Sequence, residues 1–269
     1  MSSSQQRVLY LPHGGGPMPI MGDPSHAKMV EFLKRFGEST EKPSAILLIS
    51  AHWEAPQPTI ISSANPGLYF DYSGFPPEFY EIDYPAVGEP ELAEKIHTLL
   101  DAAGLNPAME TQRGFDHGVF IPLMLMYPDA DIPIVELSLV RGLDPQTHID
   151  MGKAIAGLEW DNLLVIGSGM SFHNPRGFQS TGPEAEAKAE SFHHWLHETC
   201  AGPDLTEAER DQRLANWEAA PNGRFCHPRE EHLIPLHVCY GYGAGNGMVA
   251  DVIFYDEVIT KKVSGLLWQ

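Results

Sequence analysis

The sequence predicts an α/β protein, a single domain over residues 1–269 with a central, mostly parallel sheet and helices on both faces. Three short apolar segments, residues 8–11, 45–51 and 163–166, have the length and composition of buried strands. Each ends at or near a histidine, and glycines that allow a tight turn follow two of them. Open α/β sheets bind ligands at the carboxyl ends of their strands, so these segments also predict where a site lies.

The amino-acid composition argues for a single large domain and against some classes of partner. The chain has 269 residues, of which 43% are hydrophobic, which suits one large domain with a substantial core. Lys and Arg number 17 against 36 Asp and Glu, so the formal net charge is −19. This charge argues against nucleic-acid and membrane partners. Three cysteines form no metal-type CxxC pair, and no segment suggests a signal peptide or a membrane span, so we expect a cytoplasmic protein.

Helix signals lie between the strands. The Asp-Pro pairs at 23–24 and 144–145 indicate an N-cap followed by proline at the first helical position. Pro228 is interpreted in the same way, which would place Glu231 and His232 in the first two turns of a helix. The expected helical segments are residues 24–36, 89–103, 119–127, 144–158 and 183–218. The further expected strands are residues 59–62, 132–140 and 248–255.

Residues 65–90 are unusually rich in aromatic residues, prolines and glycines. No regular element fits this composition, and a loop of this length in a compact domain is usually functional or disordered. Its aromatic content argues against disorder. We therefore expect a lid or wall over the site, the alternative being a surface loop that is packed by its own aromatic side chains.

Histidines at strand ends and loop starts indicate one metal or catalytic centre. Those at the three strand ends are His13, His52 and His173, and His232 follows a later turn signal. The nearby carboxylates are Glu54, Asp116 and Glu231. Imidazole suits iron, zinc, copper and nickel, whereas magnesium and calcium prefer oxygen ligands. The spacing alone does not decide between non-haem iron and zinc.

The other histidines are expected to have structural or surface roles. The chain contains 13 histidines in total. His26 and His148, each in the first turn of an expected helix, are expected on the surface. His193 and His197 are four residues apart on an expected helix, but the segment is polar and lacks an HExxH pattern, so a surface or packing role is expected there.

Seven motifs together resemble a known family. In chain order they are Pro12-His13-Gly14-Gly15, Ser50-Ala51-His52-Trp53-Glu54, Tyr72-Ser73-Gly74-Phe75-Pro76, Asp83-Tyr84-Pro85-Ala86, Arg113-Gly114-Phe115-Asp116-His117-Gly118, Gly167-Ser168-Gly169 with His173-Asn174, and His232-Leu233-Ile234-Pro235-Leu236. The set is similar to the class III (LigB-type) extradiol ring-cleavage dioxygenases, and within them to the 4,5-DOPA extradiol dioxygenase subgroup. The resemblance covers roughly residues 8–255.

The resemblance implies a doubly wound fold with one divalent metal ion per chain, Fe(II) being expected and Zn(II) the alternative. His13 and His52 match the family's two metal histidines, and His232 is the expected third ligand. Glu231 beside it keeps that assignment open, because the third ligand in better-known catechol dioxygenases of this class is a glutamate. His173 matches the acid/base histidine or a fourth ligand.

The implied reaction inserts both atoms of O2 into a catechol ring and yields a muconic semialdehyde. His173 would take a proton from the catechol, and His117 matches a further active-site histidine near substrate or oxygen. Tyr72 and Phe75 are expected to stack on the ring. Arg113 and Arg176 are candidates for binding a substrate carboxylate, with a structural ion pair as the alternative for each.

Two other readings stay open on the residues alone. The same histidines could hold Zn(II) in a hydrolase whose nucleophile is metal-bound hydroxide, or they could hold a metal in a binding module without catalysis. The sequence does not say which catechol is used or which ring bond is cleaved. It is compatible with a homo-oligomer.

Overall fold

The computed structural model describes residues 6–269, and its centre is one sheet of eight strands in the order β4-β3-β5-β2-β6-β1-β8-β7. The strands are β1 (Arg7–Pro12), β2 (Ala45–Ala55), β3 (Thr59–Ile61), β4 (Ala108–Glu110), β5 (Ile134–Val140), β6 (Leu163–Gly169), β7 (Ala250–Val258) and β8 (Lys261–Trp268). Strands β5, β2, β6 and β1 are parallel to one another. Strand β3 pairs antiparallel with β5, and β8 pairs antiparallel with both β1 and β7. The predicted mostly parallel sheet is confirmed.

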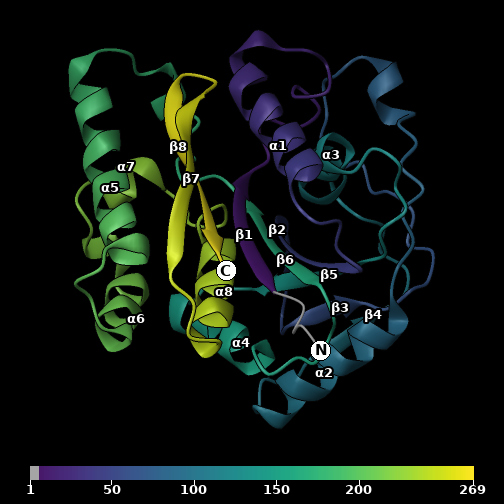
Figure 1. Ribbon diagram of the computed structural model, residues 1–269. Coiled ribbons are helices and arrows are strands. Elements are labelled where there is room, and N and C mark those ends of the chain that lie inside the picture. The colour runs from purple at the N-terminus through teal and green to yellow at the C-terminus, as the bar shows by residue number, and fades with distance from the viewer. Residues whose placement is uncertain (1–5) are drawn as a thin grey trace.

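Helices cover both faces of this sheet, as predicted. They are α1 (Ala27–Ser39), α2 (Pro90–Ala102), α3 (His117–Met126), α4 (Pro145–Ile155), α5 (Pro183–Ala201), α6 (Glu207–Ala215), α7 (Gly223–Cys226) and α8 (Ile234–Gly245). Helices α8, α4 and α2 lie on one side of the central strands and α1 and α3 on the other (Figure 1). Because both faces are covered, every residue of β1 and β6 is buried.

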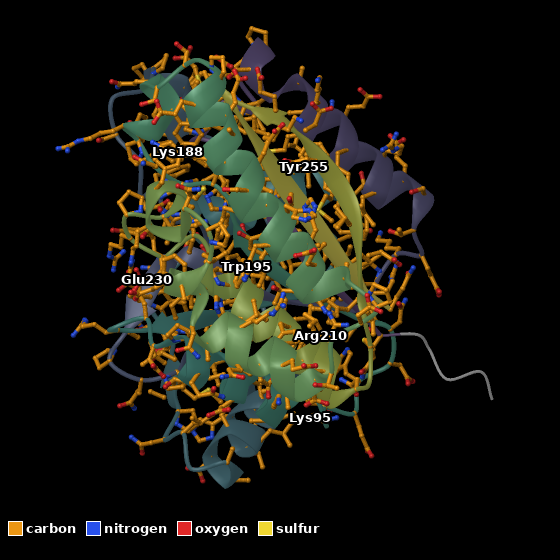
Figure 2. The ribbon with its side chains drawn as sticks, turned by 90° about the vertical axis from the view of Figure 1, so that its left-hand side faces the viewer. Lys95, Lys188, Trp195, Arg210, Glu230 and Tyr255 are labelled. Atoms are coloured by element: carbon orange, nitrogen blue, oxygen red, sulfur yellow. The ribbon has the colours of Figure 1, made fainter. Side chains whose placement is uncertain are left out.

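The remaining helices extend the molecule beyond the parallel strands. Figure 2 shows α5 lying over the β7–β8 hairpin, with Trp195 of α5 and Tyr255 of β7 labelled. Helix α6 follows α5 and packs against α4. The expected helical segment 183–218 is therefore divided into two α-helices and a short 3-10 turn at Trp217–Ala219.

Close packing of α4 on α8 depends on glycine. A Cβ added to Gly152 would lie 2.2 Å from the carbonyl oxygen of Val238, and one added to Gly241 would lie 2.1 Å from that of Ile149. Only residues without a Cβ allow the two backbones to approach this closely. Helix α8 in turn packs on β6, β1 and β2, so this contact fixes the start of α8 against the strand ends.

One expected helix needs correction, and two strands were not expected. Helix α8 begins at Ile234, with Pro235 in its first turn, so the helix expected from Pro228 is wrong and His232 lies in a turn before the helix. Strands β4 and β8 were not expected from the sequence. Strand β4 has only three half-buried residues and no clear pattern, whereas β8 carries Val263, Leu266, Leu267 and Trp268 after its two lysines, so its apolar signal was overlooked.

Within residues 6–269, no helix is both long enough and apolar enough to cross a lipid bilayer.

Candidate metal centre

His13 directly follows β1, and the neighbouring strand β6 fixes its position. Its backbone N–H donates to the carbonyl of Gly169 at 3.1 Å, and its Nδ1 lies 2.9 Å from the Ser168 hydroxyl. That hydroxyl donates to the carbonyl of Gly118 at 2.5 Å, so it accepts the proton of His13 Nδ1. The Nε2 atom of His13 is therefore unprotonated and free to bind a cation.

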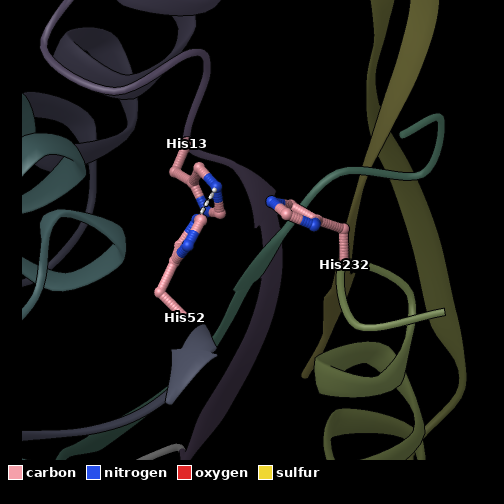
Figure 3. A group of neighbouring side chains, drawn as sticks. All are labelled: His13, His52 and His232. Carbon is pink, nitrogen blue, oxygen red and sulfur yellow. Dashed lines mark hydrogen bonds between the residues drawn. The ribbon is translucent and has the colours of Figure 1, made fainter. Parts of the chain in front are cut away.

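His52 lies inside β2 at an irregularity of the strand. The register between β2 and β5 shifts between Ile49 and Glu54, and such bulges redirect side chains near functional sites. Ser50 supports this segment, because its hydroxyl donates to Asp116 at 2.7 Å and accepts the backbone N–H of His52 at 3.1 Å. As a result, Nε2 of His52 lies 3.0 Å from Nε2 of His13 (Figure 3).

His232 approaches the same point from the turn before α8 (Figure 3). Its carbonyl accepts the Tyr10 hydroxyl at 2.8 Å and the backbone N–H of Met170 at 3.1 Å. Gly169 permits this approach, since a Cβ there would lie 2.1 Å from the carbonyl oxygen of His232. Three segments that are far apart in the sequence thus place His13, His52 and His232 with one ligand atom each within 4.8 Å of the others.

Burial keeps these three imidazoles neutral. It lowers the pKa of His13 and of His232 well below the ordinary value of a histidine, and the neighbouring histidines lower both further. Burial and the neighbouring His117 lower the pKa of His52 to about 4. Neutral imidazole is the form that binds metal ions, so the centre is ready to take one near neutral pH.

The protons available at His52 indicate that a cation belongs between the rings. A proton on Nδ1 of His52 suits the carboxylate of Asp71, 3.6 Å away, but it leaves two unprotonated Nε2 atoms facing each other across 3.0 Å. A proton on Nε2 instead turns the lone pair of Nδ1 toward that carboxylate. A divalent cation bound by both Nε2 atoms satisfies His13, His52 and Asp71 together, and nitrogen donors suit iron or zinc.

His173 and His232 share the carboxylate of Glu231. Oε1 of Glu231 lies 2.9 Å from Nδ1 of each ring. The backbone N–H of His173 donates to the carbonyl of Cys226 at 3.0 Å, and the two rings stack with centroids 3.4 Å apart. The His173 side chain is 25% exposed, whereas that of His232 is 6% exposed. Arg229 contacts the other oxygen of Glu231 at 3.4 Å and also pairs with Glu54.

His117 begins α3 and is held by Asp71. Its backbone N–H and its Nδ1 both lie within hydrogen-bond reach of Oδ1 of Asp71, at 3.0 and 2.8 Å. Its ring centroid lies 3.9 Å from that of His52. Although burial alone would raise it, the pKa of Asp71 lies below its ordinary value because of the hydrogen bond to His117. Asp71 was not expected from the sequence, because nothing in residue order distinguishes it from the other acidic residues of the aromatic-rich segment.

Residues 65–90, here called the aromatic loop, lie beside this cluster. The ring of Tyr72 meets that of His117 edge to face with centroids 5.7 Å apart, and Phe75 packs against Tyr72 at 5.5 Å. Phe75 also approaches the glycine turn after His13, where a Cβ on Gly16 would lie 3.2 Å from its ring. Residues 65–80 therefore contribute aromatic side chains next to the histidines.

Arg113 is engaged behind the cluster. Its guanidinium lies 5.0 Å from the Trp53 ring and 4.8 Å from the Tyr69 ring, and it donates to Asp116 at 3.1 Å. Asp116 is fully buried and also caps α3. These contacts favour the structural ion pair over a substrate role. Arg176, the other arginine considered for a substrate carboxylate, is exposed.

The surface positions expected for His26 and His148 are wrong. Both side chains are fully buried. Nε2 of His26 accepts the backbone N–H of Gly15 at 3.1 Å, and Nε2 of His148 accepts that of Val140 at 3.0 Å. A neutral imidazole accepts at one nitrogen and donates at the other, so it can satisfy buried backbone groups. His193 has the expected packing role: it is buried and bonded to Ser171 at 2.9 Å.

Comparisons with known proteins agree on one family. The family model described as the catalytic LigB subunit of aromatic ring-opening dioxygenase matches residues 8–264. The chain is 37% identical over 252 residues to the 4,5-DOPA dioxygenase extradiol of Beta vulgaris, which covers 92% of this chain and 90% of that protein. It is 38% identical over 252 residues to Dioxygenase tasH of Hapsidospora irregularis, covering 87% of this chain and 77% of that protein.

Two comparisons extend over nearly the whole chain. The 4,5-DOPA dioxygenase extradiol of Escherichia coli strain K12 is 32% identical over 267 residues, which cover 99% of this chain and 92% of that protein. The crystal structure of an uncharacterized protein from Escherichia coli K12 superposes with a TM-score of 0.76 at 26% identity, covering 98% of this chain and 99% of that one.

Proposed function

Since this chain belongs to the LigB family of aromatic ring-opening dioxygenases and is an extradiol dioxygenase of catechols, we propose that His13, His52 and His232 hold its single metal ion. The observation that carries this proposal is the 3.0 Å approach of two Nε2 atoms whose other ring nitrogens face Ser168 and Asp71. Burial keeps His52 neutral, and neither neutral tautomer suits both His13 and Asp71, whereas a bound cation does.

The proposed metal ion is Fe(II). When bound, Fe(II) supplies a charge that favours deprotonation of the catechol hydroxyls and a redox centre that lets ring electrons reach dioxygen, which Zn(II) does not supply. The protein's part is to hold the three imidazoles neutral and correctly oriented. Burial keeps the imidazoles neutral, and the hydrogen bonds of His13 to Ser168 and of His232 to Glu231 help to orient them.

We assign the acid/base role to His173. The bond from its Nδ1 to Glu231 leaves Nε2 able to accept a catechol proton, and the carboxylate stabilises the resulting imidazolium. Its 25% exposed side chain is the more accessible of the stacked pair. A ligand atom of His232 lies within 4.8 Å of those of His13 and His52, whereas His173 is not a member of that group. This argues against His173 as a fourth ligand.

Three other residues would bind and shield the substrate. His117 presents the ring nitrogen that does not contact Asp71, and Tyr72 beside it would pack against the aromatic ring of the catechol. Phe75 extends this apolar side and would help to exclude water from the reaction. Because several relatives are named 4,5-DOPA dioxygenase extradiol, we propose L-DOPA as the first substrate to test.

We propose the cytoplasm as the site of action. The three cysteines are buried free thiols, and the net charge of −19 disfavours binding to nucleic acid or anionic membranes.

The test is a ring-cleavage assay with the whole chain. The protein is reconstituted anaerobically with Fe(II), L-DOPA, protocatechuate or catechol is added, and oxygen is then admitted while absorbance and oxygen uptake are followed together. We expect a yellow product with one O2 consumed per ring cleaved for at least one substrate. Tightly held zinc with neither colour nor oxygen uptake would contradict the proposal and favour the hydrolase or the binding module.

A further inference from the structure

The aromatic loop carries one carboxylate that contacts two histidines of the cluster. Oδ1 of Asp71 lies 2.8 Å from Nδ1 of His117, and its Oδ2 lies 3.6 Å from Nδ1 of His52. The Asp71 side chain is only 11% exposed, so water screens its charge weakly. The first contact is a hydrogen bond, and the second is an electrostatic contact that is too long to be one.

The backbone fixes Asp71 in this position. The segment before it runs beside the segment that precedes α3: the N–H of Tyr69 donates to the carbonyl of Phe115 at 2.7 Å, and the N–H of Phe115 donates to that of Gly67 at 2.9 Å. Gly114 allows the two segments to touch, since a Cβ there would lie 2.7 Å from a backbone carbon of Leu68. The carboxylate is therefore placed by backbone pairing.

The Asp71 carboxylate has a different role for each of the two histidines, His117 and His52. His117 needs an acceptor for its Nδ1 proton, because the hydrogen bond at one ring nitrogen decides whether the other is left unprotonated. His52 needs a negative charge near Nδ1, because that nitrogen must keep its proton when Nε2 binds a cation. The other metal histidines have separate partners, His13 the neutral Ser168 and His232 the charged Glu231.

We propose that Asp71 is a positioning residue of the reaction centre, which fixes the tautomer of His117 and supports His52 as a metal ligand at the same time. This inference rests on the proposed function, because it takes His52 as a metal ligand. It adds a second role for the aromatic loop, which then orients the centre as well as bordering the substrate.

Two substitutions separate the two effects. Asp71→Asn keeps the shape of the side chain, so its amide oxygen can still accept from His117, but its NH2 group replaces the oxygen that faces His52. We expect Asp71→Asn to weaken Zn2+ binding about 10–100-fold and to leave the His117 tautomer unchanged. Asp71→Ala removes both contacts, so we expect it to weaken Zn2+ binding and also to release His117 from the Nδ1-protonated form.

The measurements use the full-length, metal-free protein. Titration calorimetry gives the Kd for Zn2+, and long-range proton–nitrogen NMR reports which ring nitrogen of His117 carries the proton. Asp83→Asn is the matched control, because Asp83 is exposed in the same loop, and we expect it to change neither readout. A general loss of stability would not by itself change the tautomer of His117 that NMR reports. Thermal unfolding measures the stability of each variant separately.

Two results would overturn the proposal. One is a Zn2+ affinity of Asp71→Asn within twofold of the wild type, and the other is a uniformly Nδ1-protonated His117 in Asp71→Ala. If Asp71→Ala does not fold, the isosteric Asp71→Asn variant still decides the metal-binding half. Both readouts use neither catechol nor oxygen, so failure of the ring-cleavage assay and failure of this inference are distinguishable.

Discussion

At the scale of single residues, the partner of each histidine separates a metal ligand from a structural group. His148 satisfies two backbone groups, through Nε2 to Val140 and Nδ1 to Asp144, and has no nitrogen left for a cation. His13 bonds to Ser168 through Nδ1 alone, so its Nε2 can bind a cation. The sequence displays the residue type and its distance from a strand end, but it does not display these partners.

This contrast explains which site residues could be predicted. His13 and His52 were found because each follows a buried run, a pattern that residue order alone reveals. Asp71 and the hydroxyl of Ser168 could not be found in this way, because their roles depend on contacts across 46 and 155 residues of sequence. The burial of His26 was missed because its place in a first helical turn does not reveal that Nε2 accepts the N–H of Gly15.

Loss of a ligand and loss of the base should be separable. We expect His13→Ala to abolish stoichiometric metal binding, because His13 is fully buried and no other side chain can replace its Nε2 from that strand end. We expect His173→Ala to keep the metal and lose turnover, since His173 is not a member of the group in which His13, His52 and His232 bring their ligand atoms together. Metal content by mass spectrometry and oxygen uptake with L-DOPA check both. Metal loss in His173→Ala would make it a ligand.

At the scale of elements, the carboxyl ends of β1 and β6 bring the site together. Gly169 is the last residue of β6, and its carbonyl accepts the backbone N–H of His13. Because glycine has no Cβ, the backbone of His232 can pack directly against it. The strands themselves were predictable from continuous apolar runs. The turn that carries His232 was not, because the choice between Pro228 and Pro235 as the start of α8 is made by packing on the strand ends.

Gly169→Ala tests this junction. The added Cβ would lie 2.1 Å from the carbonyl oxygen of His232, so the turn must move and its bonds from Tyr10 and Met170 must stretch. We expect a loss of about 1–3 kcal/mol in the free energy of unfolding and weaker metal binding. Chemical denaturation and metal titration measure these effects. Gly157→Ala is the control, since no atom lies within 4 Å of a Cβ at that exposed glycine, and equal behaviour of the two variants would refute the argument.

At the scale of the whole molecule, the fold keeps neutral histidines in its interior. Burial lowers the pKa of His148 and of His237 to about 4, and it lowers the pKa of His193 to about 3. The ordinary pKa of a histidine is 6.5, so below that pH these histidines bind protons in the unfolded chain but stay neutral in the folded one. Since the unfolded state binds more protons, the free energy of unfolding must fall as the pH falls from about 6.5 toward 4.

His148→Gln isolates one of these contributions. Glutamine also offers one acceptor and one donor, so it can replace the bonds to Val140 and Asp144, but it does not titrate. One histidine contributes a slope of about 1.4 kcal/mol per pH unit in this range, and we expect the variant to lose about that much. Urea denaturation of metal-free protein between pH 4.5 and 7.5 measures the slope, with metal removed because its ligands titrate too.

The control for this experiment is His194→Gln. The His194 side chain is 77% exposed on α5, so its removal should leave the pH dependence of unfolding unchanged. A slope in His148→Gln equal to that of the wild type would mean that His148 takes up its proton without unfolding. The acid sensitivity of the fold would then have to come from the remaining buried histidines, whereas a reduced slope would tie it directly to an imidazole that bonds two backbone groups.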